Sequence, residues 1–435
     1  MRLVGIDTPV LNTGGPLEAE QWAWLEGVLA PDGPPTLCFV HYPPFLLDPD
    51  EAEHYDNLAE PGRGRLLALF ERARVGAVFC GHVHHPFWNH HRGIDYYLVP
   101  STAFVRPGFA ELARVAPGDE YGRNEVERLG FCVVDLAPAS RPRVSWVATH
   151  ADDPAPAAPR RCPLGLTLRH AWDAVEDVAV DGLDPYRRKR ARNDLVLLAA
   201  WDLGVRLLRV PFDDLRDPAT RARMLALAEH GFRFVPFAVG PLSDADRALV
   251  EACRGALRAV ELVIPRAQLD LPLPALAVDR WVAPLGRRPD VLEDFDHFVP
   301  HGFAPDADDD LPRARGEGAV FRVASDPVAA VARIVAHTAD RGRAAVALVL
   351  LPREAEGRAQ VDDARVTERA LAAFEAALAH PQVPVLLDTT VDHDRGYFPR
   401  HGLLDRRGNP RSAWRALRAA AVKAGSSPTN PLARG

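Results

Sequence analysis

The sequence predicts an α/β protein in which a first, incomplete sandwich domain precedes a (β/α)8 barrel. Two observations lead to this class. Apolar runs such as 36–41 and 75–80 stop abruptly at glycine, proline or histidine, which is typical of buried strands in a parallel sheet. Between 163 and 424, eight strand-like runs alternate with helix-like stretches, as a closed barrel requires. A doubly wound open sheet is the alternative for this second part.

Composition divides the chain of 435 residues into four ranges. Residues 1–150 form the first domain. Residues 151–162 are rich in proline and alanine and cannot build a core, so they are expected to be a semi-rigid linker. Residues 163–424 form the barrel domain, and residues 425–435 are expected to be a disordered tail.

Hydrophobic periodicity gives the elements of the first domain. Strands are predicted at 2–6, 36–41, 75–80, 95–99, 129–135 and 143–149, and helices at 17–29 and 62–74. Leu66, Leu69 and Phe70 recur at helical spacing and predict a stripe that packs on a sheet. The last two strands are expected to pair as a hairpin that closes one sheet of a sandwich.

The barrel elements follow from the same patterns. Strand-like runs begin near Leu164, Val205, Phe232, Ala259, Leu276, His297, Ala344 and Val383. Helices are predicted at 188–203, 218–230, 243–257, 326–341, 364–380 and 411–422. Parallel strands that are linked by right-handed crossovers close naturally into such a barrel.

Histidines follow two of the predicted strands in the first domain. His41 ends one apolar run, and Gly81, His82 and His84 follow the next. Alternation of side chains is expected to place His82 and His84 on one side of the chain and Val83 on the other. Because ligands collect at the carboxyl ends of parallel strands, the three imidazoles are expected to face one point and bind metal. The alternative is a solvated histidine loop.

The spacing of these motifs resembles the calcineurin-like metallophosphoesterases, and most closely their branch of cyclic-nucleotide phosphodiesterases. The matching motifs are Val40-His41-Tyr42-Pro43-Pro44, Gly81-His82-Val83-His84, Val99-Pro100-Ser101-Thr102, and the lead-in segments Gly5-Ile6-Asp7-Thr8, Gly14-Gly15-Pro16-Leu17 and Gln21-Trp22-Ala23-Trp24-Leu25.

The resemblance implies a hydrolase of phosphomonoesters or phosphodiesters with two divalent cations, Mn, Fe or Zn, about 3.5–4 Å apart. In that family's pattern His41 and His82 would bind one cation and His84 the other. The polar segment with His85, Asn89, His90 and His91 is expected to be a loop outside the site. Asn57 is expected to cap its own loop.

Several motifs of the calcineurin-like metallophosphoesterases are absent from this sequence. No D-x-H and no G-N-H occurs, and the only Gly-Asp pair, Gly118-Asp119, lies after the histidine motif. These motifs carry the carboxylates, the asparagine and the acid histidine, so no catalytic residue beyond the metal site is assigned. We expect the chain to represent the second half of such an enzyme, which alone would be inactive.

The barrel contributes its own candidates, because sites in this fold lie at the carboxyl ends of the strands. The candidates at those ends are Arg209, Asp213, Arg266, Asp270, His301, Arg353, Glu354, Asp388, Asp392 and His393, and the carboxylates singled out among them are Asp270, Glu354, Asp388 and Asp392. Glycoside hydrolysis needs two such groups, and residues 402–411 resemble a segment of glycoside-hydrolase barrels. A carbohydrate-active or non-catalytic binding barrel with a vestigial metal domain is therefore the alternative function. The favoured alternative is that these charges belong to surface loops and salt bridges around the barrel mouth.

Composition excludes several other functions. A net charge of −7 argues against nonspecific nucleic-acid binding. The sequence contains no run of 18 apolar residues, so no membrane span is predicted.

The five cysteines are an odd number without CxxC spacing, which predicts core residues in a reducing compartment. With no signal peptide in the first residues, we expect a cytoplasmic protein. The excess of arginine over lysine and the abundant alanine and proline indicate a GC-rich bacterial genome.

Overall fold

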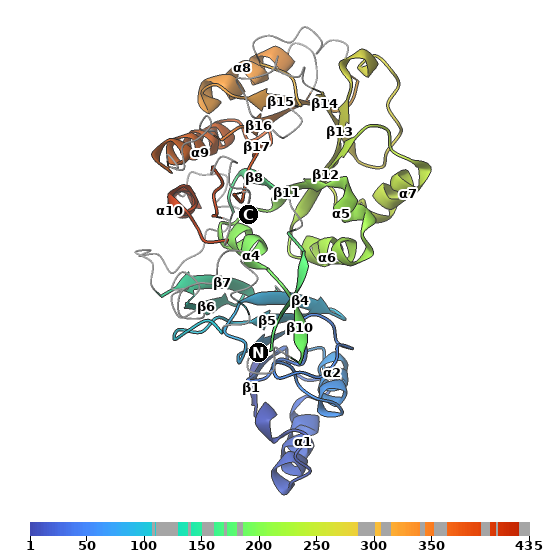
Figure 1. The fold of residues 1–435 in the computed structure, drawn as a ribbon, viewed down its shortest axis with the longest axis vertical. Helices are drawn as coiled ribbons and strands as arrows, with labels where there is room; N and C mark the ends of the chain where they lie inside the picture. Colours follow the sequence, from blue (N-terminus) through green and yellow to red (C-terminus); the bar gives the residue numbers. More distant parts are fainter. Residues whose placement is uncertain are drawn as a thin grey trace. The chain divides into compact units, whose positions relative to one another are not determined.

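The computed structural model describes residues 1–106, 109, 129–137, 141–149, 161–168, 172–180, 186–285, 301–305, 315–339, 344–351, 363–392, 401–405 and 408–425. The protein is mixed α/β, as predicted, and it forms two compact units (Figure 1). Unit 1 consists of Met1–Pro156 and Asp173–Leu198. Unit 2 consists of Ala157–Trp172 and Ala199–Gly435.

Unit 1 is built on a five-stranded sheet with the strand order β1-β2-β3-β5-β4. Its strands are β1 (Arg2–Ile6), β2 (Thr36–Val40), β3 (Ala77–Cys80), β4 (Phe87–His91) and β5 (Ile94–Leu98). Only β4 runs antiparallel to its neighbour. The pairing of β2 with β3 ends at Val40 opposite Cys80, so both strands finish at the same edge of the sheet.

Helices cover one face of this sheet. The 3-10 turn η1 (Thr8–Val10) precedes α1 (Pro16–Val28), and α2 (Gly62–Arg72) follows β2. The predicted stripe on α2 is buried in one core with sheet residues such as Val78, which confirms the helical periodicity.

Aromatic side chains lie on the other face, where Phe79 stacks on Phe39 and on Tyr97 at centroid distances of 5.3 and 5.2 Å. There β6 (Gly130–Asp135) and β7 (Arg143–Ala148) form the predicted antiparallel pair. Near β1 the described residues leave this face of the sheet accessible to solvent. Leu3 on β1 is 63% exposed, and Phe39 on β2 is 40% exposed.

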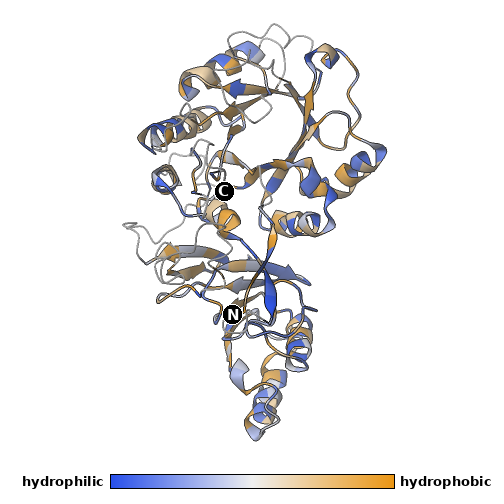
Figure 2. Ribbon diagram, in the orientation of Figure 1, coloured by the Kyte–Doolittle hydropathy of each residue, from blue (hydrophilic) through white to orange (hydrophobic). Residues whose placement is uncertain are grey.

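Two segments of unit 1 differ from the expectation. The predicted polar loop around Asn89 is largely the strand β4, because its backbone pairs with β5. The predicted helix 188–203 begins instead with strand β10 (Arg188–Arg192), which pairs antiparallel with β9 (Val175–Ala179), and only α4 (Leu195–Asp202) is helical. Lys189 and Ala191 are buried while Arg188 and Arg190 are exposed. That period of two indicates a strand, although the segment is hydrophilic (Figure 2).

Unit 2 contains a closed barrel of eight parallel strands, as predicted (Figure 1). The strands are β8 (Leu164–Thr167), β11 (Leu207–Pro211), β12 (Arg233–Val239), β13 (Ala259–Ile264), β14 (Asp279–Pro284), β15 (Gly318–Val323), β16 (Ala344–Val349) and β17 (Val385–Leu387). Pairing of Leu386 with Gly165 closes the barrel and excludes the open doubly wound sheet. The sixth strand begins at Gly318 and not near His297, a residue outside the described ones.

Helices lie between the barrel strands in the sequence. They are α5 (Phe212–Arg216), α6 (Pro218–Glu229), α7 (Asp244–Cys253), the 3-10 turn η6 (Arg266–Gln268), α8 (Pro327–Ala339) and α9 (Asp363–Ala379), and α10 (Ser412–Gly425) follows the last strand. In the part of the chain that the structure describes, no helix has the length and apolar character needed to cross a bilayer. All five cysteines are free, and four of them are buried, as expected for core residues.

The barrel lumen is filled by strand side chains. The side chains that fill the lumen form a hydrophobic cluster without any helix residue. Its buried members are Val235, Ala259, Val263, Trp281, Ala283, Val320, Val346, Leu348 and Leu386, and Leu207 and Leu285 pack against it partly buried. Trp281 is its largest member and pairs in register with Gly318. A Cβ added at Gly318 would lie 2.8 Å from Trp281 Cδ1, so the missing side chain makes room for the indole.

Gly318→Ala is expected to lower the free energy of unfolding of unit 2 by about 1–3 kcal/mol, because the added methyl group overpacks the lumen against Trp281. Urea unfolding followed by circular dichroism measures the change. Gly255→Ala is the control, because a Cβ there meets nothing within 4 Å. Equal stability of the two variants would contradict this account of the lumen.

Candidate functional site

His41 and His82 meet at the edge of the sheet where β2 and β3 end. His41 directly follows β2, and the backbone N–H of Gly81, directly after β3, donates to Val40 O at 3.1 Å. His41 Nε2 lies 3.2 Å from His82 Nδ1. Adjacent parallel strands therefore bring together two of the three predicted ligands.

The backbone after β3 is not extended, so the predicted alternation of His82 and His84 along a strand is wrong. Both residues have positive φ angles, 66° for His82 and 57° for His84. Val83 between them is fully buried. Left-handed backbone at two non-glycine residues costs free energy and is often found at functional sites. This turn, and not a strand pleat, presents the two imidazoles.

Backbone carbonyls hold the orientation of both imidazoles. His82 Nε2 lies 3.0 Å from Tyr55 O, and His84 Nδ1 lies 3.1 Å from Phe104 O. A carbonyl only accepts, so each of these nitrogens carries a proton and donates it. The lone pair of neutral His82 is then on Nδ1, toward His41, and that of His84 is on Nε2. His84 makes no hydrogen bond to either of the other two among the described residues.

Burial keeps these imidazoles neutral. It lowers the pKa of His82 to about 4, although the neighbouring Asp56 carboxylate acts in the opposite direction. Burial also lowers the pKa of His84, and Asp56 and Arg106 act on that residue too. At neutral pH both rings keep a lone pair, which a metal ligand requires.

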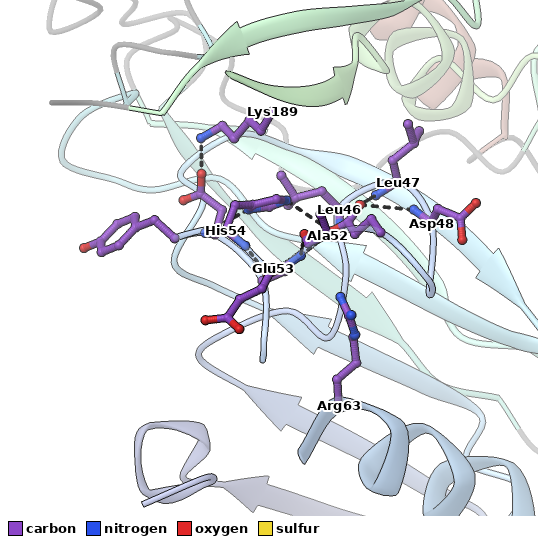
Figure 3. Close-up of polar contacts among 12 residues, drawn as sticks. Leu46, Leu47, Asp48, Ala52, Glu53, His54, Arg63 and Lys189 are labelled. Carbon is purple, nitrogen blue, oxygen red and sulfur yellow. Dashed lines mark hydrogen bonds and ion pairs between the residues drawn. The ribbon is translucent and has the colours of Figure 1, made fainter. Parts of the chain in front are cut away.

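A buried carboxylate lies next to the histidines. Asp56 is fully buried, and its Oδ1 is 3.6 Å from His82 Nε2. Arg106 Nη1 donates to Asp56 Oδ1. Lys189 Nζ, from strand β10, donates to Asp56 Oδ2 (Figure 3). The contacts anchor the backbone that carries Tyr55 O, the acceptor of the His82 proton. The sequence analysis missed all three residues.

The loop that leads to Asp56 is braced by Glu51. Glu51 accepts the backbone N–H groups of Leu46 and Leu47 at 2.8 and 2.9 Å (Figure 3). Asn57 Nδ2 donates to Glu51 Oε1 at 2.8 Å, and Asn57 Oδ1 accepts from His54 N. Asn57 therefore caps its own loop, as expected.

The remaining histidines of the segment make structural contacts. His85 is fully buried and stacks on Phe109 at 5.5 Å, and His90 Nδ1 contacts Asp95 Oδ1 at 2.8 Å. Asn89 donates to Leu46 O. His85 and Asn89 are buried and His90 is half-buried, so this segment is not the solvated loop that the sequence predicts.

The predicted carboxylates of the barrel have different surroundings. Asp270 is exposed after η6, whereas Asp388 is buried and accepts from Leu351 N at 2.9 Å. Asp392 is also buried and accepts from Gly402 N, with Arg411 at 3.2 Å. Asp388 and Asp392 thus brace the segments that follow the strands. Glu354 lies outside the described residues.

A buried charge cluster inside the barrel includes a residue that the sequence analysis missed. Glu261, on β13, accepts from Arg209 Nε at 2.5 Å and from Arg209 Nη2 at 2.8 Å. Arg209 Nη2 also donates to His301 Nε2 at 2.7 Å. A single acidic residue inside the apolar run 259–264 was the available signal, since a charge in a buried strand requires a partner.

Lys189→Met is expected to destabilise unit 1 by on the order of 3 kcal/mol, because the buried Asp56 carboxylate loses one of its two cationic partners. The measurement is the urea midpoint of unfolding. Lys423→Met, at the exposed second lysine of the chain, is the control and is expected to be neutral. Equal midpoints for both variants would rule out a structural role of Lys189.

Burial alone would raise the pKa of Glu261, but Arg209 and His301 outweigh it and lower the value to about 2. The folded pKa is below the ordinary value of 4.5, so this stabilisation is present above pH 4.5 and is lost as the pH falls toward 2. We expect the stability difference between wild type and Glu261→Gln to shrink over that range by about 3 kcal/mol. Unfolding in urea at a series of pH values measures it, and a constant difference would contradict the ion pair.

Comparison with known proteins gives one local similarity of sequence. No family model matches the chain. A stretch of 68 residues is 44% identical to the serine/threonine-protein phosphatase CPPED1 of Danio rerio, and it covers 16% of this chain. The chain spans only 21% of the length of that curated relative. Among solved structures, GAP50, the anchor in the inner membrane complex of Plasmodium, is 15% identical, with a TM-score of 0.26, over 34% of this chain and 45% of its own. The sequence match indicates a phosphatase-like region in this chain.

Proposed function

We propose that unit 1 carries part of a metal-dependent phosphoesterase site of the calcineurin-like type, in which His41 and His82 bind one divalent cation and His84 binds a second. The observation that carries this proposal is the 3.2 Å separation of His41 Nε2 and His82 Nδ1. The local similarity to a phosphatase supports the reaction class.

The geometry of the pair fits a shared cation. Imidazole nitrogens bind Zn²⁺ at about 2.0–2.1 Å, and two such ligands at octahedral or tetrahedral angles are about 2.9–3.4 Å apart. The observed distance is within this range. Tyr55 O fixes the tautomer of His82 that such binding needs, and Phe104 O does the same for His84.

The residues around the pair favour an anionic substrate. Two cationic side chains, Arg106 and Lys189, contact Asp56, whose Oδ1 lies 3.6 Å from His82 Nε2. A phosphomonoester or phosphodiester is the substrate class that such a surrounding attracts. Two bound cations of Mn, Fe or Zn would supply Lewis acidity and a hydroxide nucleophile there.

The alternative, a carbohydrate-active barrel with a vestigial metal domain, lacks a comparable observation. Asp388 and Asp392 brace backbone segments through hydrogen bonds, and Asp270 is exposed. None of the three forms a carboxylate pair of the kind that glycoside hydrolysis uses among the contacts described. We therefore place the proposed reaction in unit 1.

Titration with Co²⁺, followed by visible absorbance, tests the site. His41→Ala and His82→Ala are each expected to weaken binding about 100-fold or more, because each removes a ligand of the same cation. His84→Ala is expected to lower the number of bound cations and to abolish Mn²⁺-dependent hydrolysis of bis(p-nitrophenyl) phosphate wherever wild type shows it.

His380→Ala, at the end of α9 in unit 2, is the matched control and is expected to bind Co²⁺ as wild type does. Wild-type affinity in His82→Ala would refute the shared cation. Absence of Co²⁺ binding by the wild-type chain would refute a metal site made from its histidines.

A further inference from the structure

Strands β9 and β10 form a hairpin that lies between barrel strands β8 and β11 in the sequence but belongs to unit 1. Its inner face is part of the unit 1 core, because Val178 on β9 and Ala191 on β10 belong to the same buried cluster as Val78 on β3. At the end of β10, Arg192 Nη2 donates to Trp88 O on β4 at 3.0 Å. The hairpin is therefore packed against the unit that carries the candidate metal site.

Two basic side chains of this hairpin hold the loop that precedes α2. Arg187, directly before β10, donates from Nη2 to Glu53 O at 2.5 Å. Lys189 Nζ donates to Asp56 Oδ2. Figure 3 shows Lys189 pointing toward the loop that carries Glu53 and His54. The hairpin thus contacts the loop at two separate points.

The contact of Lys189 is rigid because both of its charged groups are buried. The Lys189 side chain is 1% exposed, and Asp56 is fully buried. The ammonium nitrogen also lies 4.4 Å from the ring centroid of Phe109, a member of the unit 1 core. Separating two charges that are removed from water is costly. The position of the hairpin therefore fixes the position of Asp56.

The same loop orients His82. Tyr55 O, in the residue before Asp56, lies 3.0 Å from His82 Nε2, and Asp56 Oδ1 lies 3.6 Å from it. The Tyr55 ring packs against the imidazole at a centroid distance of 4.9 Å. Partners of this kind fix the orientation of a metal-binding histidine, and their loss typically lowers metal affinity by about 10–100-fold.

We propose that the β9–β10 hairpin sets the affinity of the metal site, with Lys189 and Arg187 as positioning residues that act on His82 through the loop. This inference rests on the metal site proposed above. Because coupling between two sites is reciprocal, a bound cation also stabilises the packed position of the hairpin. Metal occupancy is thereby linked to the segment that connects the first two strands of the barrel.

Titration of the full chain with Co²⁺, followed by visible absorbance, tests the effect of the hairpin on the metal site. Lys189→Met is expected to bind Co²⁺ about tenfold more weakly and to change the spectrum of the bound ion, because His82 is no longer held in place. A purely structural role of Lys189 would lower stability and leave this spectrum unchanged.

Arg187→Ala removes one hydrogen bond of an exposed side chain, so the variant is expected to fold normally and to bind Co²⁺ about fivefold more weakly. Arg187→Lys keeps a donor and is expected to restore binding. Arg190→Ala is the matched control, because Arg190 is an exposed residue of β10. It is expected to bind Co²⁺ as wild type does.

Hydrogen exchange followed by mass spectrometry tests the reciprocal effect. Saturation with Co²⁺ is expected to slow amide exchange in β9 and β10 about tenfold in wild type but not in His82→Ala. The β6–β7 pair, the other hairpin of unit 1, is the internal reference and is expected to change less.

Equal Co²⁺ affinity of wild type and Lys189→Met would overturn this proposal and leave the metal site standing. Tighter binding by Lys189→Met would also overturn it, since the lysine would then act only by repelling the cation. Exchange in β9 and β10 that does not respond to Co²⁺ would contradict the coupling. Should Lys189→Met not fold, Arg187→Ala decides by the same criteria. A wild-type chain that binds no Co²⁺ would refute both this proposal and the metal site.

Discussion

Parallel strand pairing determines where the chemically active side chains lie in both units. In unit 1 the register of β2 with β3 makes the two strands end together, and His41 and His82 follow those ends at a separation of 3.2 Å. In unit 2 the register of β8 with β11 places Thr167 beside Arg209, a member of the buried charge cluster. Hydrogen bonds between backbones, and not the side chains themselves, therefore assemble the candidate metal site and the cluster.

The two units treat buried charge differently. Asp56 accepts from two cations, Arg106 and Lys189. Glu261 accepts two hydrogen bonds from the single guanidinium of Arg209. A buried carboxylate requires partners of this kind, and the two units supply them from different numbers of side chains.

The sequence predicted the parallel strands well because their apolar runs are continuous and end sharply. It failed where polar residues form strands: β4 carries two histidines and shows no alternation, and in β10, which carries three arginines, only the period of two at its start indicates a strand. Asp56 lies in a loop, so no periodicity could identify it. Lys189 gave a weak signal, since it is one of only two lysines in a chain with 52 basic residues. The turn that presents His82 depends on left-handed backbone, which a pattern of side chains does not predict.

The hairpin of β9 and β10 belongs to unit 1 although it follows the first strand of the barrel in the sequence. The polypeptide therefore passes from unit 1 to unit 2, returns, and leaves again. During synthesis, the first unit cannot acquire Lys189 until the ribosome has also produced β8, so its completion is delayed past the start of the second. For the same reason a fragment cut after Pro156 would separate Asp56 from its lysine, and no single cleavage of the chain yields both units intact.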